Sequence, residues 1–109
     1  MAGHGVQEIG DETFDREIVA SHLPTLVDFY GQTCGPCKAI EPLLENLATT
    51  YRGRLRVAKV NVNASPQAAT RFMVKSLPTL LLFRGGKVLD QFINQPSLPA
   101  LNKFVQRVL

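Results

Sequence analysis

The chain contains two cysteines, and they stand three residues apart in the segment Cys34-Gly35-Pro36-Cys37. Side chains at positions i and i+3 of a helical turn lie on one face, so these sulfur atoms are close enough to form a disulfide with little backbone movement. If a helix begins at Cys34, its unpaired N–H groups and positive dipole favour the nucleophilic thiolate of that residue. We therefore expect Cys34 to attack a substrate disulfide and Cys37 to resolve the mixed disulfide that results.

The two residues between the cysteines suit a helix start that a partner must approach. Pro36 has no backbone N–H, but a residue in the first turn of a helix has no partner for that group within the helix. Gly35 has no side chain that would obstruct a substrate disulfide. An inert buried cysteine pair is the alternative, and it would not require this Gly-Pro insert.

Asp28 is the one charged residue in the apolar run 26–30, which predicts a central strand just before the cysteines. A carboxylate in such a strand is costly to bury unless it is paired or protonated, so burial should raise its pKa into the working range of a general base. Asp28 is thus the candidate acceptor of the Cys37 proton. Lys59, on the next predicted strand, is a candidate partner; the plain alternative is an exposed strand end and a solvated lysine.

A metal site is the main competing interpretation of a cysteine pair. Zinc would need two further ligands, and the only histidines, His4 and His22, lie in segments without a pattern. Two cysteines are also too few for a secreted domain that is held together by disulfides. We therefore expect no metal, and no cofactor beyond the Cys34–Cys37 disulfide itself.

The bulk properties narrow the class of protein. With 109 residues, of which 45% are hydrophobic, the chain should fold as a single domain over residues 1–109. No apolar run reaches the length of a membrane span, and the N-terminus lacks the features of a secretory signal peptide. The net charge is +3, and the alternating Arg52, Arg54 and Arg56 predict one solvated face of a strand. We expect a cytoplasmic protein that binds neither nucleic acid nor membranes.

Strands and helices alternate along the chain and would hold these residues in place. A first helix should begin near Asp11 or Thr13, a second at the cysteines with a kink at Pro42, a third at Ser65-Pro66 and a fourth after Ser97. Gly85-Gly86 predicts a tight hairpin. Strands are predicted at 6–9, 26–30, 55–61, 79–83 and 87–93. The order β-α-β-α-β-α-β-β-α predicts an α/β fold with a central mixed five-stranded sheet, flanked by four helices.

At these residues the sequence resembles the thioredoxin family, from about Phe14 to the C-terminus. The resemblance is carried by 27–30, 34–38, Pro42, 57–61, 77–80 and 83–86. It implies the thioredoxin fold and the activity of a protein-disulfide reductase. It also implies that Cys34 is the nucleophile, Cys37 the resolving thiol and Asp28 the buried carboxylate behind them, with Lys59 nearby.

The resemblance extends to the surface around the cysteines. It implies that Pro78 is a cis proline facing the disulfide, with the Leu77 backbone available to an extended substrate segment. Gly86 corresponds to a family glycine in the hairpin. A Gly-Pro insert is typical of reducing members, so the implied partners are a thioredoxin reductase and disulfide-containing proteins, and we expect a monomer.

Three positions depart from the family pattern. Thr33 stands where the family usually has tryptophan, as it often has at Tyr30, and Asn94 replaces a glycine in a loop expected to border the site. Loss of a large ring removes apolar contact area from a partner surface. Two alternatives to a general reductase therefore stay open: a specialised electron donor with restricted partners, and a thioredoxin-fold binding subunit whose cysteines are incidental.

Overall fold

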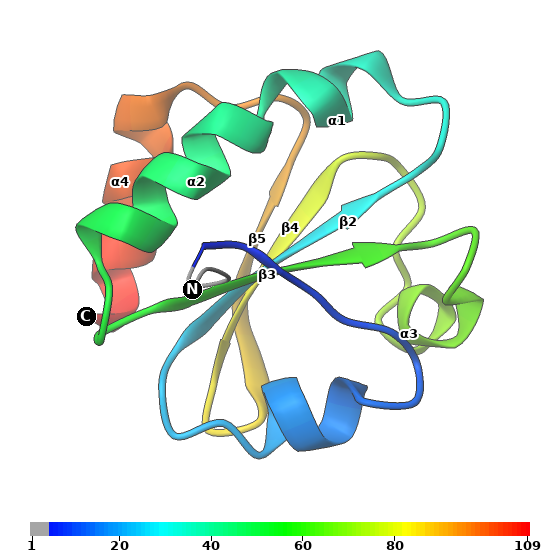
Figure 1. Cartoon of the computed structure of the whole chain (residues 1–109), viewed down its shortest axis with the longest axis horizontal. Helices are drawn as coiled ribbons and strands as arrows, with labels where there is room; N and C mark the ends of the chain where they lie inside the picture. Colours follow the sequence, from blue (N-terminus) through cyan, green and yellow to red (C-terminus); the bar gives the residue numbers. More distant parts are fainter. Residues whose placement is uncertain (1–4) are drawn as a thin grey trace.

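A five-stranded sheet forms the centre of the computed structural model, which describes residues 5–109 (Figure 1). In space the strand order is β1-β3-β2-β4-β5. Both β1 and β2 pair with β3 in parallel, whereas β4 runs antiparallel to β2 and β5. The predicted mixed sheet is thus confirmed, with its strands at β1 (Gln7–Glu8), β2 (Thr25–Tyr30), β3 (Arg56–Asn61), β4 (Thr79–Arg84) and β5 (Lys87–Ile93).

Helices cover both faces of the sheet. One face carries α1 (Gly35–Ala39), α2 (Glu41–Thr50) and α4 (Leu98–Val105), followed by the short 3₁₀ helix η2 (Gln106–Val108). The other carries the π-helix η1 (Asp15–Val19), blue in Figure 1, and α3 (Pro66–Arg71). None of the helices in residues 5–109 has the length and apolar character needed to cross a membrane.

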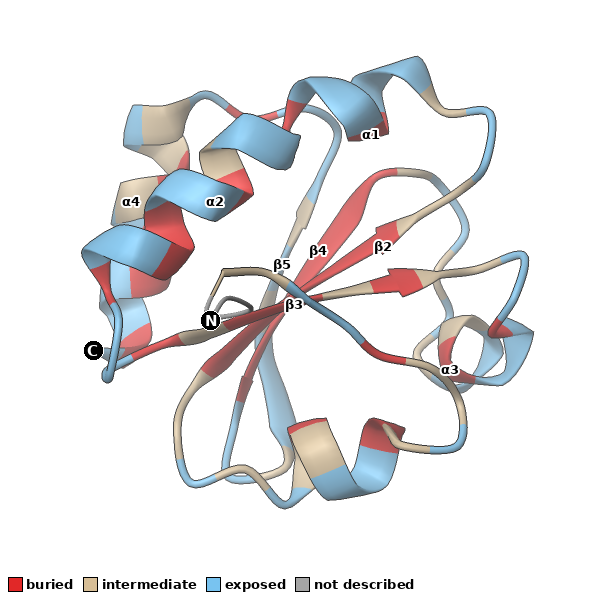
Figure 2. Cartoon of the chain, in the orientation of Figure 1, coloured by how far each residue is buried: buried red, intermediate tan, exposed pale blue. Residues whose placement is uncertain are grey.

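The central strand β2 divides the core in two. Its Leu26 packs with side chains from α2 and α4, while Val27 and Phe29 pack with the η1 and α3 side. Because side chains alternate along a strand, Asp28 shares the face of Leu26 and points toward α1 and α2. Figure 2 shows β2 buried along nearly its whole length.

Pro42 interrupts the helix that follows the cysteines, as predicted. The helix divides at the buried Ile40 into α1 and α2, and Pro42 occupies the first turn of α2. A proline there costs no hydrogen bond, because first-turn N–H groups have no partner within the helix. The Gly85-Gly86 hairpin is also present, with φ values of +60° and +80° that favour glycine.

The predicted first helix is present, but neither Asp11 nor Thr13 caps it with its side chain. Residues 11–13 form a turn, and a π-helix follows. Asp11 instead caps α3, because its carboxylate accepts hydrogen bonds from Gln67 N (3.1 Å) and Ala68 N (2.9 Å). Ser65 stands at the N-cap of α3, but its hydroxyl accepts from Asp11 N (3.2 Å) and does not cap the helix. The cap is therefore supplied by a residue distant in sequence.

The three alternating arginines do not share a strand face, contrary to prediction. Arg52 and Arg54 lie in the turn after α2, and only Arg56 belongs to β3. Arg54 stacks over the Tyr51 ring at 5.3 Å, whereas Arg56 pairs with Glu17 at 2.9 Å. The arginines alternate in the sequence, but only Arg56 has the extended backbone that would place alternate side chains on one face.

Candidate active site

The cysteine pair lies at the start of α1, just after the loop that follows the central strand β2. Cys34 and Cys37 form a disulfide with 5.2 Å between their Cα atoms. Cys34 is the N-cap of α1, and its Sγ accepts a hydrogen bond from Cys37 N at 3.2 Å. Cys34 is half-buried, whereas Cys37 is only 3% exposed. A partner that approaches the disulfide therefore meets Cys34 first.

The residues that flank Cys34 are open to solvent. Thr33, Gly35 and Pro36 are all exposed. A Cβ atom added at Gly35 would meet nothing within 4 Å, so the chain itself does not require glycine at this position. Any steric need for glycine must come from a molecule that docks on the site.

Asp28 lies on the face of β2 that α2 covers, with only 1% of its surface exposed. Among the described residues, its Oδ1 atom has no hydrogen-bond partner. Burial raises the pKa of Asp28 to about 7; the positive charge of Lys59 opposes the rise, and the carboxylates of Glu41 and Glu8 add to it. The carboxyl group can thus exchange a proton near neutral pH.

Lys59 is the neighbour of Asp28 across β2 and β3, where the two Cα atoms are in register. It is half-buried, and its Nζ atom lies 5.5 Å from the centre of the Tyr30 ring. Tyr30 donates its hydroxyl hydrogen to Glu8, at 2.7 Å and 2.9 Å from the two carboxylate oxygens. Burial, together with this hydrogen bond, raises the pKa of Tyr30 to about 12.

Leu77, Pro78 and Asn94 come together at the end of the sheet near the cysteine loop. The Leu77–Pro78 peptide bond is cis, and Asn94 donates its backbone N–H to Pro78 O at 3.3 Å. Asn94 has a φ of +83°, a left-handed conformation that asparagine tolerates better than most residues. A Cβ added at Gly31 would lie 2.9 Å from Leu77 Cδ1, so Leu77 packs against the backbone that leads to Cys34.

Sequence reasoning missed Glu8 and Glu41 as members of the site. Both affect the pKa of Asp28, but one lies on an edge strand and the other on a helix. Their only sequence signal is a charged residue beside apolar positions. No cluster of three or more metal-ligating side chains occurs in the described part of the chain; His22 is exposed, and His4 lies outside the described residues.

A disulfide at the start of a helix, over a buried carboxylate of a central strand, defines a thiol–disulfide oxidoreductase with a redox-active Cys-x-x-Cys pair. The chain belongs to the thioredoxin family, since the family model described as Thioredoxin matches residues 5–107. It is a thioredoxin-type thiol–disulfide oxidoreductase, that is, a protein-disulfide reductase.

Relatives from several bacteria agree with this assignment. The chain is 34% identical to "Thioredoxin 1" of Nostoc sp. over 102 residues, which cover 94% of this chain and 95% of the relative. It is 39% identical to "Thioredoxin" of Acidithiobacillus ferridurans, over 93% of this chain and 94% of the relative. It is 42% identical to "Thioredoxin" of Chlorobaculum thiosulfatiphilum, over 79% of this chain and 80% of the relative.

Proposed function

We propose that the protein reduces disulfides of other proteins, with Cys34 as the nucleophile and Cys37 as the resolving thiol. The observation that carries this assignment is the unequal burial of the two cysteines, because Cys34 is half-buried and Cys37 is 3% exposed. The N-terminal position of Cys34 on α1 adds the helix dipole, which stabilises its thiolate in the reduced protein.

In the first step, the Cys34 thiolate attacks one sulfur of the substrate disulfide. A new S–S bond forms between Cys34 and the substrate, while the substrate's own S–S bond breaks. The second substrate sulfur leaves as a thiolate and takes up a proton from water. The protein and its substrate are then joined by a mixed disulfide.

In the second step, the Cys37 thiol gives its proton to the Asp28 carboxylate, and its thiolate attacks Cys34 Sγ. The mixed disulfide breaks and the remaining substrate sulfur leaves as a thiolate, so the substrate has gained two electrons and the protein has become a disulfide. With a pKa of about 7, Asp28 is substantially ionised at neutral pH and can accept the proton.

Partners would dock on the exposed rim around Cys34. Thr33 flanks the nucleophile, and Leu77 offers its backbone beside the cis Pro78, to which Asn94 is hydrogen-bonded. We infer that disulfide-containing proteins bind here as substrates, and that a thioredoxin reductase returns two electrons to the disulfide. The Gly35-Pro36 insert supports a reducing role, and hence a cytoplasmic site of action.

A trapping experiment tests the two cysteine roles. Reduced Cys37→Ser protein should accumulate a mixed disulfide between Cys34 and insulin, whereas the Cys34→Ser protein should accumulate none. Wild-type protein with a dithiol reductant should accelerate insulin reduction. The assignment is overturned if only Cys34→Ser forms the adduct, and the reductase function is overturned if wild-type protein gives no acceleration.

Restricted partner choice is a second candidate, and it rests on the rim. Thr33 is exposed beside the nucleophile, and Asn94 holds a left-handed backbone next to Pro78. If these residues select partners, a general thioredoxin reductase should recharge the wild-type protein slowly and the Thr33→Trp, Asn94→Gly variant faster. Equal and rapid turnover of both proteins would rule this candidate out.

A further inference from the structure

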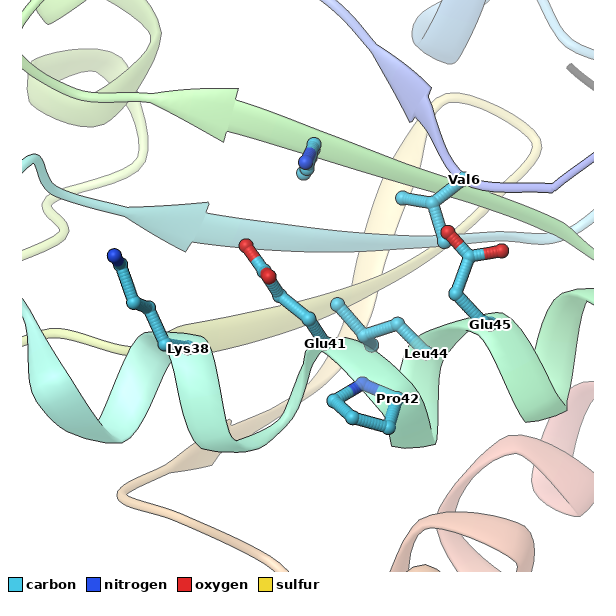
Figure 3. Close-up of a pocket in the computed structure, with 7 residues that line it drawn as sticks. Val6, Lys38, Glu41, Pro42, Leu44 and Glu45 are labelled. Carbon is cyan, nitrogen blue, oxygen red and sulfur yellow. The ribbon is translucent and has the colours of Figure 1, made fainter.

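A pocket of about 340 Å³ lies between the α1–α2 helices and the sheet. Its charged lining residues are Lys38, Glu41, Glu45 and Lys59, drawn from α1, α2 and β3. In Figure 3, the carboxylates of Glu41 and Glu45 rise from α2 toward the strands, and Lys38 points the same way. The pocket therefore places charged side chains over the α2 face of the sheet.

Asp28 belongs to a row of registered residues on that face. Glu8 of β1 is in register with Lys59 of β3, which is in register with Asp28 of β2. The row continues into apolar residues, Leu80 of β4 and Phe92 of β5. Residues in register on neighbouring strands point to the same side of a sheet, so Lys59, which lines the pocket, lies on the same face as the buried Asp28.

Two of the charges in this row contact Tyr30. Glu8 is held by the Tyr30 hydroxyl, and the Lys59 ammonium lies over the Tyr30 ring. Within residues 5–109, neither Lys59 nor Glu41 forms a salt bridge of 4.0 Å or less. Glu41 is therefore an unpaired carboxylate in a pocket that also contains Lys59, the lysine beside Asp28.

We propose that Glu41 is a positioning residue for the resolving step, and that it acts through Asp28 across this pocket. Its negative charge favours keeping on Asp28 the proton that Cys37 gives up, while Lys59 favours release of that proton to water in the pocket. The proposal rests on the role given to Asp28 above. In agreement with it, Glu41 is the strongest of the charges that raise the pKa of Asp28, and Glu45 is not among them.

The charged residues around Asp28 include Glu45, which supplies a matched control for a substitution of Glu41. The titratable groups on this face of the sheet and on the helices that cover it are Glu8 on β1, Tyr30 on β2, Lys59 on β3, Lys38 on α1, and Glu41 and Glu45 on α2; the Cys37 thiol of α1 joins them in the reduced protein. Glu41 and Glu45 are both exposed, lie one helical turn apart and line the same pocket. Glu45→Gln therefore removes the same charge from the same pocket, farther along α2.

The first test follows the titration of the Asp28 carboxyl group by NMR in the oxidised protein, which requires no substrate. We expect Glu41→Gln to move the midpoint to lower pH by more than Glu45→Gln does, and Lys59→Met to move it to higher pH. Equal shifts in the two glutamine variants, or no shift in Glu41→Gln, would overturn the proposal. Unchanged NMR chemical shifts of residues far from Asp28 verify that each variant is folded.

A kinetic test separates this proposal from the role of Asp28. Reduced protein reacts with a substoichiometric aromatic disulfide whose two thiolates absorb light, so the second release reports the attack by Cys37. We expect the pH midpoint of that release to fall in Glu41→Gln, and the pH dependence near neutrality to vanish in Asp28→Asn. If Asp28→Asn alone changes the profile, only the Glu41 proposal fails; if Asp28→Asn leaves the profile unchanged, the role of Asp28 fails as well.

Discussion

The two faces of β2 differ in what they bury. On the α3 side, the rings of Phe14, Phe29, Phe72 and Phe83 form a cluster whose centres lie 5.2–6.5 Å apart. On the α2 side, an otherwise apolar core contains the Asp28 carboxyl group, one oxygen of which has no hydrogen-bond partner among the described residues. Both faces bury apolar side chains that stabilise the fold, but the α2 face gives up part of that stability to hold a buried titratable group.

The largest change in the free energy of unfolding should come from a substitution in the aromatic cluster on the α3 side. Phe83 is 1% exposed and packs edge-on against Phe14 and Phe72, at 5.8 Å and 5.2 Å. Phe83→Ala should lower the free energy of unfolding by about 3–5 kcal/mol, as measured by urea denaturation. Because Phe83 lies on the opposite face from Asp28, the folded fraction should keep its disulfide exchange rate. A loss of disulfide exchange activity in the folded variant would contradict the claim that the Phe83 face contributes to stability and not to the reaction.

In contrast to Phe83→Ala, the Asp28→Asn substitution should raise the free energy of unfolding. The pKa of Asp28 is raised from 3.8 to about 7, so the folded protein binds more protons than the unfolded chain between these values, and its stability falls as the pH rises. At 1.36 kcal/mol for each pH unit, the cost above pH 7 is at most about 4 kcal/mol.

Urea denaturation of oxidised Asp28→Asn and wild-type proteins, from about pH 4 to about pH 8, measures this cost. The variant's advantage should grow up to about pH 7 and then stay constant. Glu12→Gln, which removes an exposed carboxylate, serves as the control and should show no such growth. An advantage for Asp28→Asn that is the same at both ends of the pH range would contradict the unpaired burial of Asp28.

A smaller change in the free energy of unfolding is expected at Met73, a residue with a strained backbone on the α3 side. Met73 follows α3 with a φ of +56° and is 76% exposed. Val74 N donates to Ala69 O and Met73 N to Thr70 O, a helix ending that favours glycine at the position of Met73. Met73→Gly should raise the free energy of unfolding by about 1 kcal/mol, as measured by urea denaturation. Lys75→Gly is the control, and an equal gain there would contradict the explanation by backbone strain.

Local sequence patterns were enough to predict the parts of the fold that depend on local forces. The apolar run of β2, the Pro42 break and the Gly85-Gly86 turn each act through their own backbone or immediate neighbours. Asp28 could be selected because a lone charge in a buried strand has few explanations. The cysteine pair was evident from its spacing.

Features that depend on distant partners could not be predicted in this way. The cap that Asp11 provides for α3 joins residues 56 and 57 positions apart, and the Glu8–Tyr30 hydrogen bond spans 22 positions. The influence of Glu41 on Asp28 requires α2 to lie over the sheet. Met73 takes a left-handed conformation because the end of α3 demands it, against the preference of the residue itself.

The most direct test of the central claim is the pH dependence of the second thiolate release, measured in wild-type and Asp28→Asn proteins. If Asp28 accepts the Cys37 proton, the wild-type rate should rise with a midpoint near its pKa of about 7. The Asp28→Asn rate should be lower and show no transition there. A variant that keeps the wild-type rate and midpoint would contradict the role of the buried carboxylate in disulfide exchange.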